Sequence, residues 1–146
     1  MHPAPSFKTE DEATLLAHLA AHPFVTLAVA PRGRLLIAHA PVLARRLPEG
    51  LVLDFHLSRG NALTPFLVEG FRAVAVSLAA DAYVSPDWYV KPGQVPTWDY
   101  VSVEVEGPVA ALDDNGLIAL LDDLSGSAIR PLSSRAMTGP STSTLT

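Results

Sequence analysis

Short apolar or alternating segments, separated by turns that contain proline or glycine, run through most of this chain. Residues 24–30 are apolar throughout, and residues 51–57 alternate between large apolar side chains and Val52, Asp54 and His56. Alternation with a period of two is typical of strands. The turns at 31–34 and 47–50 are too short for crossover helices, so neighbouring strands should pair antiparallel. The predicted fold class is mainly β with flanking helices (α+β), an antiparallel sheet closed into a barrel.

The remaining segments complete this prediction. A capping box formed by Thr9 and Glu12 begins a helix that Pro23 ends. Residues 35–43 form a strand that bends at Pro41, which should lie at an edge or bulge because proline cannot donate to a ladder. Residues 73–79 and 101–106 are further strands, the second with one wet face. Residues 61–67 indicate a short helix that ends at Gly70.

A last helix is expected after Asp113 or Asp114 as N-cap. Its apolar residues predict the side that faces the core: Leu117, Ile118, Leu120, Leu121 and Leu124. The chain beyond has no periodicity and is rich in serine and threonine. We therefore expect one domain over residues 1–125 and a disordered tail over residues 126–146.

Composition limits the classes of function. The formal net charge of −5 opposes non-specific attraction to nucleic acid, and no helix-turn-helix pattern is present, so direct DNA binding is doubtful. The chain has no cysteine, which excludes disulfides and thiolate chemistry. It shows neither a signal-peptide pattern nor an apolar run long enough to span a membrane. A cytoplasmic location is the default expectation.

Both tryptophans and all three tyrosines fall between Tyr83 and Tyr100, together with three prolines. Aromatic side chains offer a flat face and a polar edge at little cost in rotamer entropy. A stiff segment rich in them suits a planar ligand or a tight subunit contact. The alternative is that these rings pack under proline-rich loops to close a small barrel.

Residues 54–63 leave a strand, turn through Gly60 and enter the predicted short helix. Backbone N–H groups at a helix start, with Ser58, Asn61 and the guanidinium of Arg59, would form a phosphate cradle. An ordinary asparagine-capped helix with a solvated arginine explains the same residues.

Other chemistry has little support. His39 lies mid-strand among apolar neighbours, where a core histidine is commoner than a ligand. His18 and His22 are spaced as two metal ligands on a helix would be, but no third ligand stands near them, so we expect no metal site. Nucleophile-elbow, P-loop and dinucleotide-binding motifs are absent, and no catalytic residue is indicated.

Taken together, these segments resemble the PaiB-like family of FMN-binding negative transcriptional regulators. The resemblance runs from about residue 7 to 124 and includes residues 21–27, 39–43 and 56–61. Its most specific parts are Tyr83-Val84-Ser85-Pro86-Asp87-Trp88-Tyr89, which is similar to the family's Y-x-S-P-x-W-Y, and Val95-Pro96-Thr97-Trp98-Asp99-Tyr100, which is similar to V-P-T-W-N-Y.

The resemblance implies an antiparallel split β-barrel of the FMN-binding type, a homodimer that holds flavin at the subunit interface, and an indirect partner in transcription. By position, Arg59 and Asn61 would hold the phosphate, with His56 and Ser58 beside it. Lys91, Thr97 and Trp98 would border the ring or phosphate. The resemblance also assigns His39 and Ser85 to the cofactor site.

The chain departs from the family pattern in several places. Ala38 replaces an amide, Asp99 replaces an asparagine, and residues 90–94 are shorter than usual and lack a histidine. The family's C-terminal portion is also missing, as in a shortened member or a truncated or frameshifted chain. Two alternatives to the regulator therefore stay open: a flavin-dependent oxidoreductase of the pyridoxamine-phosphate-oxidase-like class, and a cofactor-free, degenerate member.

Overall fold

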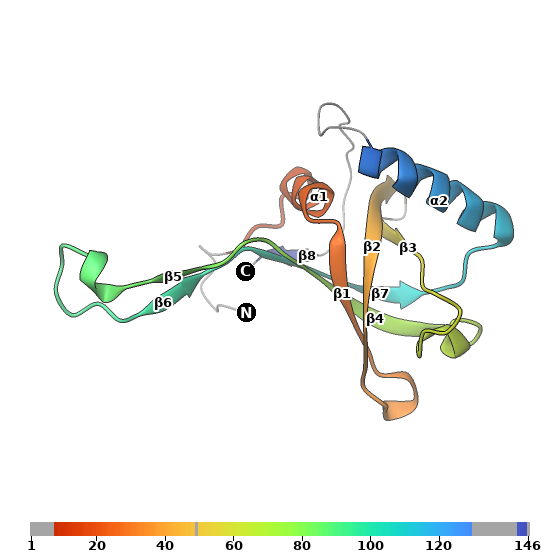
Figure 1. Cartoon of the computed structure of the whole chain (residues 1–146), viewed down its shortest axis with the longest axis horizontal. Helices are drawn as coiled ribbons and strands as arrows, with labels where there is room; N and C mark the ends of the chain where they lie inside the picture. Colours follow the sequence, from red (N-terminus) through yellow and green to blue (C-terminus); the bar gives the residue numbers. More distant parts are fainter. Residues whose placement is uncertain (1–7, 49, 130–142, 146) are drawn as a thin grey trace.

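A six-stranded antiparallel sheet curls into a half-barrel with two flanking helices, which confirms the predicted fold class (Figure 1). The structure is a computed structural model that describes residues 8–48, 50–129 and 143–145. The strand order is β3-β2-β1-β4-β7-β8. The elements are α1 (Glu12–Ala21), β1 (Phe24–Val29), β2 (Leu36–Leu47), β3 (Gly50–Phe55), β4 (Phe71–Leu78), β7 (Ser102–Val109), α2 (Asp114–Ile129) and β8 (Ser143–Leu145).

The core lies inside the curl of the sheet. Alternate residues of β1 and β2 point inward, among them Val25, Leu27 and Ala40, each 1% exposed. On the inner side, Leu15 and Leu19 of α1 pack against Val103 of β7, so the helix closes the open side of the half-barrel. Burying such side chains contributes about 1.5–3 kcal/mol each.

The apolar composition of residues 24–30 suggested a strand buried on both faces. In the structure β1 is fully buried on one face only. Phe24 is 66% exposed, because the outward-facing side of β1 has no layer packed on it within the described chain. Similarly, the wet face predicted for β7 has exceptions: Ser102 is buried, whereas Val101, just before the strand, is half exposed.

Pro41 lies within an internal strand, so the prediction of an edge or bulge was wrong. β2 changes its partner at this residue. Its first half pairs with β1 as far as Phe24↔Pro41, and its second half pairs with β3 from Val42↔Phe55 onward. Proline is tolerated here because each ladder ends beside it.

Asp11, and not Thr9, is the N-cap of α1. The Asp11 carboxylate accepts a hydrogen bond from the Thr14 backbone N–H at 2.9 Å, and the Thr14 hydroxyl donates to it as well. These bonds lower the pKa of Asp11, because they favour the charged carboxylate. Thr9 instead accepts from the Asp11 N–H.

The N-cap predicted for α2 is confirmed: Asp113 accepts from the Gly116 N–H at 2.7 Å. The buried side predicted for this helix was largely wrong. Only Leu120 is fully buried, at 1% exposure, while Leu117, Ile118 and Leu121 remain exposed, because α2 touches the sheet along a single narrow line. α2 continues through residues 126–129, and residues 130–142 of the predicted tail lie outside the described residues.

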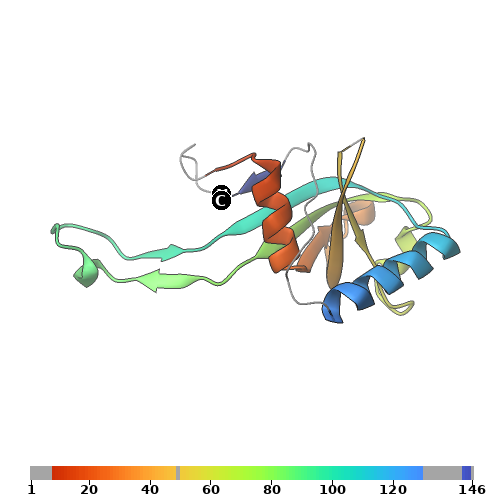
Figure 2. The same ribbon diagram turned by 90° about the horizontal axis from the view of Figure 1, so that it is seen from above.

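A long arm extends from the body where β4 ends and β7 begins (Figures 1 and 2). Its two sides are β5 (Ala82–Val84) and β6 (Thr97–Asp99), which pair as a separate two-stranded sheet. The aromatic segment, predicted as a stiff loop, is therefore a hairpin. No helix among the described residues is long and apolar enough to cross a bilayer.

Candidate functional site

The structure divides the predicted site residues into two groups. His39 lies on β2, and His56, Ser58, Arg59 and Asn61 lie on the loop that directly follows β3. The second group is on the arm: Ser85, Lys91, Thr97 and Trp98. In both views the arm and the loop after β3 lie at opposite ends of the molecule (Figures 1 and 2). One chain alone therefore does not bring Arg59 and Trp98 together.

The loop after β3 is held by its own hydrogen bonds. The Asn61 N–H donates to the Ser58 carbonyl at 2.9 Å, and the Asn61 side-chain oxygen accepts from the Leu63 N–H at 2.9 Å. The Thr64 hydroxyl also donates to the Ser58 carbonyl, at 2.9 Å. Leu63, which is fully buried, anchors the loop in the core.

These bonds overturn the expected helix-start cradle. Residues 61–67 contain only a 3₁₀ turn, η3 (Thr64–Phe66), and no α-helix. The N–H groups of Asn61, Leu63 and Thr64 are already used by acceptors inside the loop, the Ser58 carbonyl, the Asn61 side chain and the Asn61 carbonyl. An anion bound here would therefore depend on side chains.

Such side chains are present. Ser58 and Arg59 are exposed at the crest of the loop, and within the described ranges Arg59 forms no ion pair. By contrast, Arg32, Arg45, Arg46 and Arg72 each face a carboxylate. The His56 Nδ1 atom is buried without a hydrogen-bond partner in the described structure. A buried nitrogen of this kind is costly unless a partner reaches it.

His39 is exposed on the outer face of the sheet and is not a core histidine. Its Nδ1 atom lies 3.1 Å from the Thr26 hydroxyl, its cross-strand partner. Its ring stacks on Phe24 with centroids 6.3 Å apart. These contacts hold the ring on the exposed outer face.

The outer face of the sheet is a feature that the sequence analysis missed. Phe24, Ile37 and Leu78 are 66%, 54% and 52% exposed on it. The alternation along β1, with Phe24, Thr26 and Ala28 on one side, was the available signal. A sheet face that exposes several large apolar side chains, with a histidine held in place among them, is typical of an interaction surface.

The arm presents its aromatic rings to solvent. Tyr83 and Trp98 are cross-strand partners, 45% and 60% exposed. Lys91 and Thr97 are exposed beside them, whereas the Ser85 hydroxyl is used to cap the 3₁₀ turn η4 (Pro86–Trp88) through the Asp87 N–H. The arm contributes a planar apolar surface and one cation.

Next to the root of the arm, α1 is tied to β4. The buried Ser77 hydroxyl donates to the His22 carbonyl at 2.7 Å, and His18 Nε2 lies 3.3 Å from the Ser77 carbonyl. Burial lowers the pKa of His18 from its ordinary 6.5, and the neighbouring His22 lowers it further, while the Ser77 carbonyl opposes both. Among the described residues no cluster of three or more ligands could hold a metal.

Comparison with known proteins places this arrangement in a family. A family model described as "Putative FMN-binding domain" matches residues 1–136, nearly the whole chain. The chain belongs to this family, the PaiB type. The fold matches that of the FAD- and heme-binding protein from Mycobacterium smegmatis, with a TM-score of 0.69 and 21% sequence identity, over 95% of this chain and 72% of that one. No curated protein matches the chain.

The residues of this FMN-binding domain fit the two ends of FMN. Within the described part of the chain, a guanidinium without an ion pair and an exposed hydroxyl suit a phosphate, and exposed rings on a hairpin suit a flat heterocycle. The guanidinium of Arg59 and the exposed rings of the arm match the two ends of FMN in chemistry. They lie too far apart within one chain to contact the same molecule.

Proposed function

We propose that this chain binds FMN between two copies of itself, with the phosphate on the loop at residues 56–61 of one copy and the ring under the arm of the other. The observation that carries this proposal is the separation of the two groups of site residues. Each group is exposed and offers one half of the required contacts. A two-fold arrangement would complete two equivalent sites at once.

The charge and burial of both groups support the proposal. Among residues 8–48, 50–129 and 143–145 no carboxylate forms an ion pair with Arg59, which leaves its charge available to a phosphate. Trp98 keeps 60% of its surface exposed, which is unusual for so large an apolar ring unless a partner covers it. The apolar outer face around Phe24 and Ile37 offers the area that two copies would bury.

We further propose a role as a negative regulator of transcription that acts through a protein partner, in the cytoplasm. The family resemblance supports regulation, and the net charge of −5 argues against direct contact with DNA. Pull-down from a lysate of the source cells with and without FMN, followed by an operator-binding assay on the captured complex, tests this role. Direct, salt-sensitive DNA binding by the pure protein would contradict it.

Purification without added cofactor, followed by an absorption spectrum and light scattering, tests cofactor binding and assembly together. We expect flavin bands, or quenching of added FMN fluorescence, in a particle of twice the chain mass. A colourless protein that leaves FMN fluorescence unchanged would contradict the proposal and favour the cofactor-free alternative. Steady oxidation of NADH or NADPH by the loaded protein would instead favour the oxidoreductase.

A further inference from the structure

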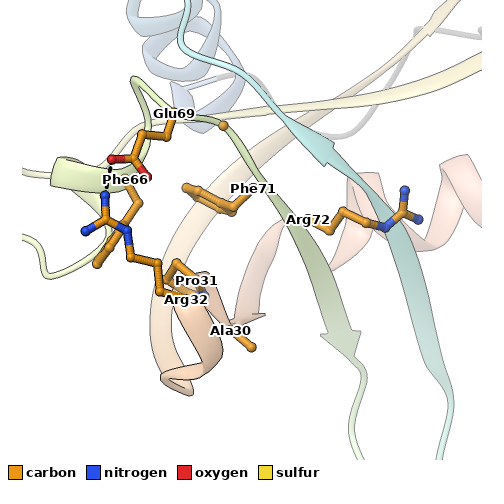
Figure 3. A pocket seen from close by; sticks show the side chains of 8 residues that line it. Ala30, Pro31, Arg32, Phe66, Glu69, Phe71 and Arg72 are labelled. Carbon is orange, nitrogen blue, oxygen red and sulfur yellow. Dashed lines mark hydrogen bonds and ion pairs between the residues drawn. The ribbon is translucent and has the colours of Figure 1, made fainter.

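A cavity of about 320 Å³ lies at the far end of the body from the arm (Figures 1 and 3). It is formed between the turn η2 (Pro31–Gly33) and the segment from η3 to the start of β4. Its lining residues are Ala30, Pro31, Arg32, Phe66, Glu69, Gly70, Phe71 and Arg72. The walls are mainly apolar, and charged groups stand at the rim. The proposed flavin contacts do not use this cavity.

Arg32 holds the two sides of the cavity together. Its guanidinium forms an ion pair with Glu69 and lies 5.8 Å from the centre of the Phe66 ring (Figure 3). Its backbone has a φ of 51°, a left-handed conformation that is uncommon for a residue other than glycine. The ion pair and the ring contact therefore bridge the two walls of the cavity.

The tip of the arm carries a side chain that matches such a cavity. Trp88 ends η4 and is 70% exposed. Its position is fixed by the hydrogen bond from its own N–H to the Ser85 carbonyl at 3.2 Å and by the Ser85 cap on Asp87. An exposed tryptophan on a fixed backbone has only two side-chain torsions to order when it becomes buried, so its entropy cost is small for its contact area.

Charge complements shape in this pairing. The arm, residues 79–101, carries Asp81, Asp87 and Asp99 against the single cation Lys91. The turn η2 with its C-cap Arg34, together with the start of β4, carries a small opposite excess: Arg32, Arg34 and Arg72 against Glu69 and against Glu106 of β7, which pairs with Arg72. Opposite potentials on two surfaces of one chain favour contact between copies.

One arm could reach both the loop at residues 56–61 and the cavity of a second copy, because the two pairs of elements follow the same order. Trp98 lies partway along the arm and Trp88 lies at its tip. On the body, the loop at residues 56–61 leads directly into η3, which lines the cavity. An arm whose middle covers Arg59 would carry its tip towards Phe66.

We propose that Trp88 of one copy inserts into this cavity of a second copy, so that the arm tip locks the dimer. The indole would lie between Phe66 and Phe71, and Asp87 would face Arg32. The inference rests on the two-copy assembly of the proposed function, and it names a contact that the flavin site does not require.

Disulfide trapping tests the contact, because the chain contains no cysteine of its own. The double variant Trp88→Cys/Glu69→Cys should form a covalent dimer on mild oxidation, seen without reductant in a denaturing gel. The arm and cavity are at opposite ends of one chain, so this bond joins two chains. Each single variant, and Trp88→Cys paired with Ile118→Cys on exposed α2, should give far less covalent dimer.

Sedimentation of Trp88→Ala supplies the second measurement. We expect the dimer dissociation constant to rise at least about 30-fold, as for a central interface residue, while Ile118→Ala leaves it unchanged. Because Trp88 is exposed in the single chain, the substitution should not alter the melting of the monomer. FMN binding is measured in parallel for each variant.

The outcomes separate this inference from the proposed function. A dimer that binds FMN, shows no excess cross-linking at Glu69 and tolerates Trp88→Ala would overturn the inference and keep the proposed function. A monomer at all concentrations would overturn both. Preferential cross-linking at Glu69 with a weakened Trp88→Ala dimer that still binds FMN when concentrated would support both.

Discussion

Tyr83 and Trp98 face one another across the two strands of the arm, with ring centroids 5.9 Å apart in an edge-on arrangement. Neither ring reaches the core of its own chain, and both remain about half exposed. Their pairing stiffens the arm and holds the indole face outward. The rings therefore do not close the barrel of their own chain, and the contact that we propose for them is with a second copy.

Replacing Trp98 by alanine should weaken FMN binding about tenfold, because a flat apolar contact worth about 1.4 kcal/mol is lost. The free energy of unfolding should fall by about 0.5–1.5 kcal/mol, because the edge-on contact with Tyr83 is lost although the ring is otherwise exposed in the single chain. Titration of FMN fluorescence and urea unfolding measure the two effects. Tyr100→Ala, also exposed on the arm, is the matched control. Equal loss in both variants would show that the arm acts only as a scaffold.

The sequence predicted the fold class and singled out the aromatic segment, but it did not predict that this segment forms a projecting hairpin. Periodicity of two marks strands wherever one face is buried, as in β3. Residues 82–100 offered no such signal, because both faces of the arm are exposed and only cross-strand pairs such as Tyr83–Trp98 hold it. The short helix after Asn61 was predicted wrongly: the chain there forms i→i−3 bonds, from the Phe66 N–H to the Leu63 carbonyl and from the Leu67 N–H to the Thr64 carbonyl, which a short apolar pattern does not distinguish from an α-helix. That the two halves of the site would lie apart could not be predicted, since one sequence does not show which contacts are made by a second copy.

Arg59 should matter for the phosphate and not for the ring. Arg59→Gln should weaken FMN binding about 10- to 100-fold, the usual effect of losing charge-assisted hydrogen bonds. Binding of riboflavin, which lacks the phosphate, should not change. Lys8→Gln, which removes an exposed cation outside the proposed contacts, should leave both affinities as they are. A parallel fall in riboflavin binding would indicate that Arg59 supports the fold of the loop instead.

Asp99 places a carboxylate directly after Trp98 on β6, where the resemblance led us to expect asparagine. Negative charge next to an anionic, electron-rich cofactor opposes binding by about 0.5–1 kcal/mol at an exposed position. Asp99→Asn should therefore raise FMN affinity about threefold, and the gain should shrink in high salt. Asp122→Asn, at an exposed aspartate of α2 outside the proposed contacts, serves as the control. An unchanged FMN affinity at low salt would show that the negative charge of Asp99 does not weaken binding.

The tie between α1 and β4 should contribute measurably to stability. Ser77 is fully buried, and its hydroxyl donates to the His22 carbonyl at the end of α1. Ser77→Ala leaves that carbonyl with one partner fewer and should lower the free energy of unfolding by about 1 kcal/mol. Urea denaturation measures it, with exposed Ser58→Ala as the control. A loss no greater than the control's would show that water replaces the bond without cost.

Acid should weaken the same junction. Burial lowers the pKa of His18 in the folded chain below 6.5, so the unfolded chain takes up the proton first as pH falls. Stability at this site is thus complete above pH 6.5 and declines below it, as linkage requires for a histidine held neutral. We expect the urea midpoint to drop between pH 7.5 and 5.5, and His18→Gln to reduce that drop. His39→Gln, on the opposite face of the sheet, should not reduce it. An equal drop in wild type and His18→Gln would assign the acid sensitivity to other groups.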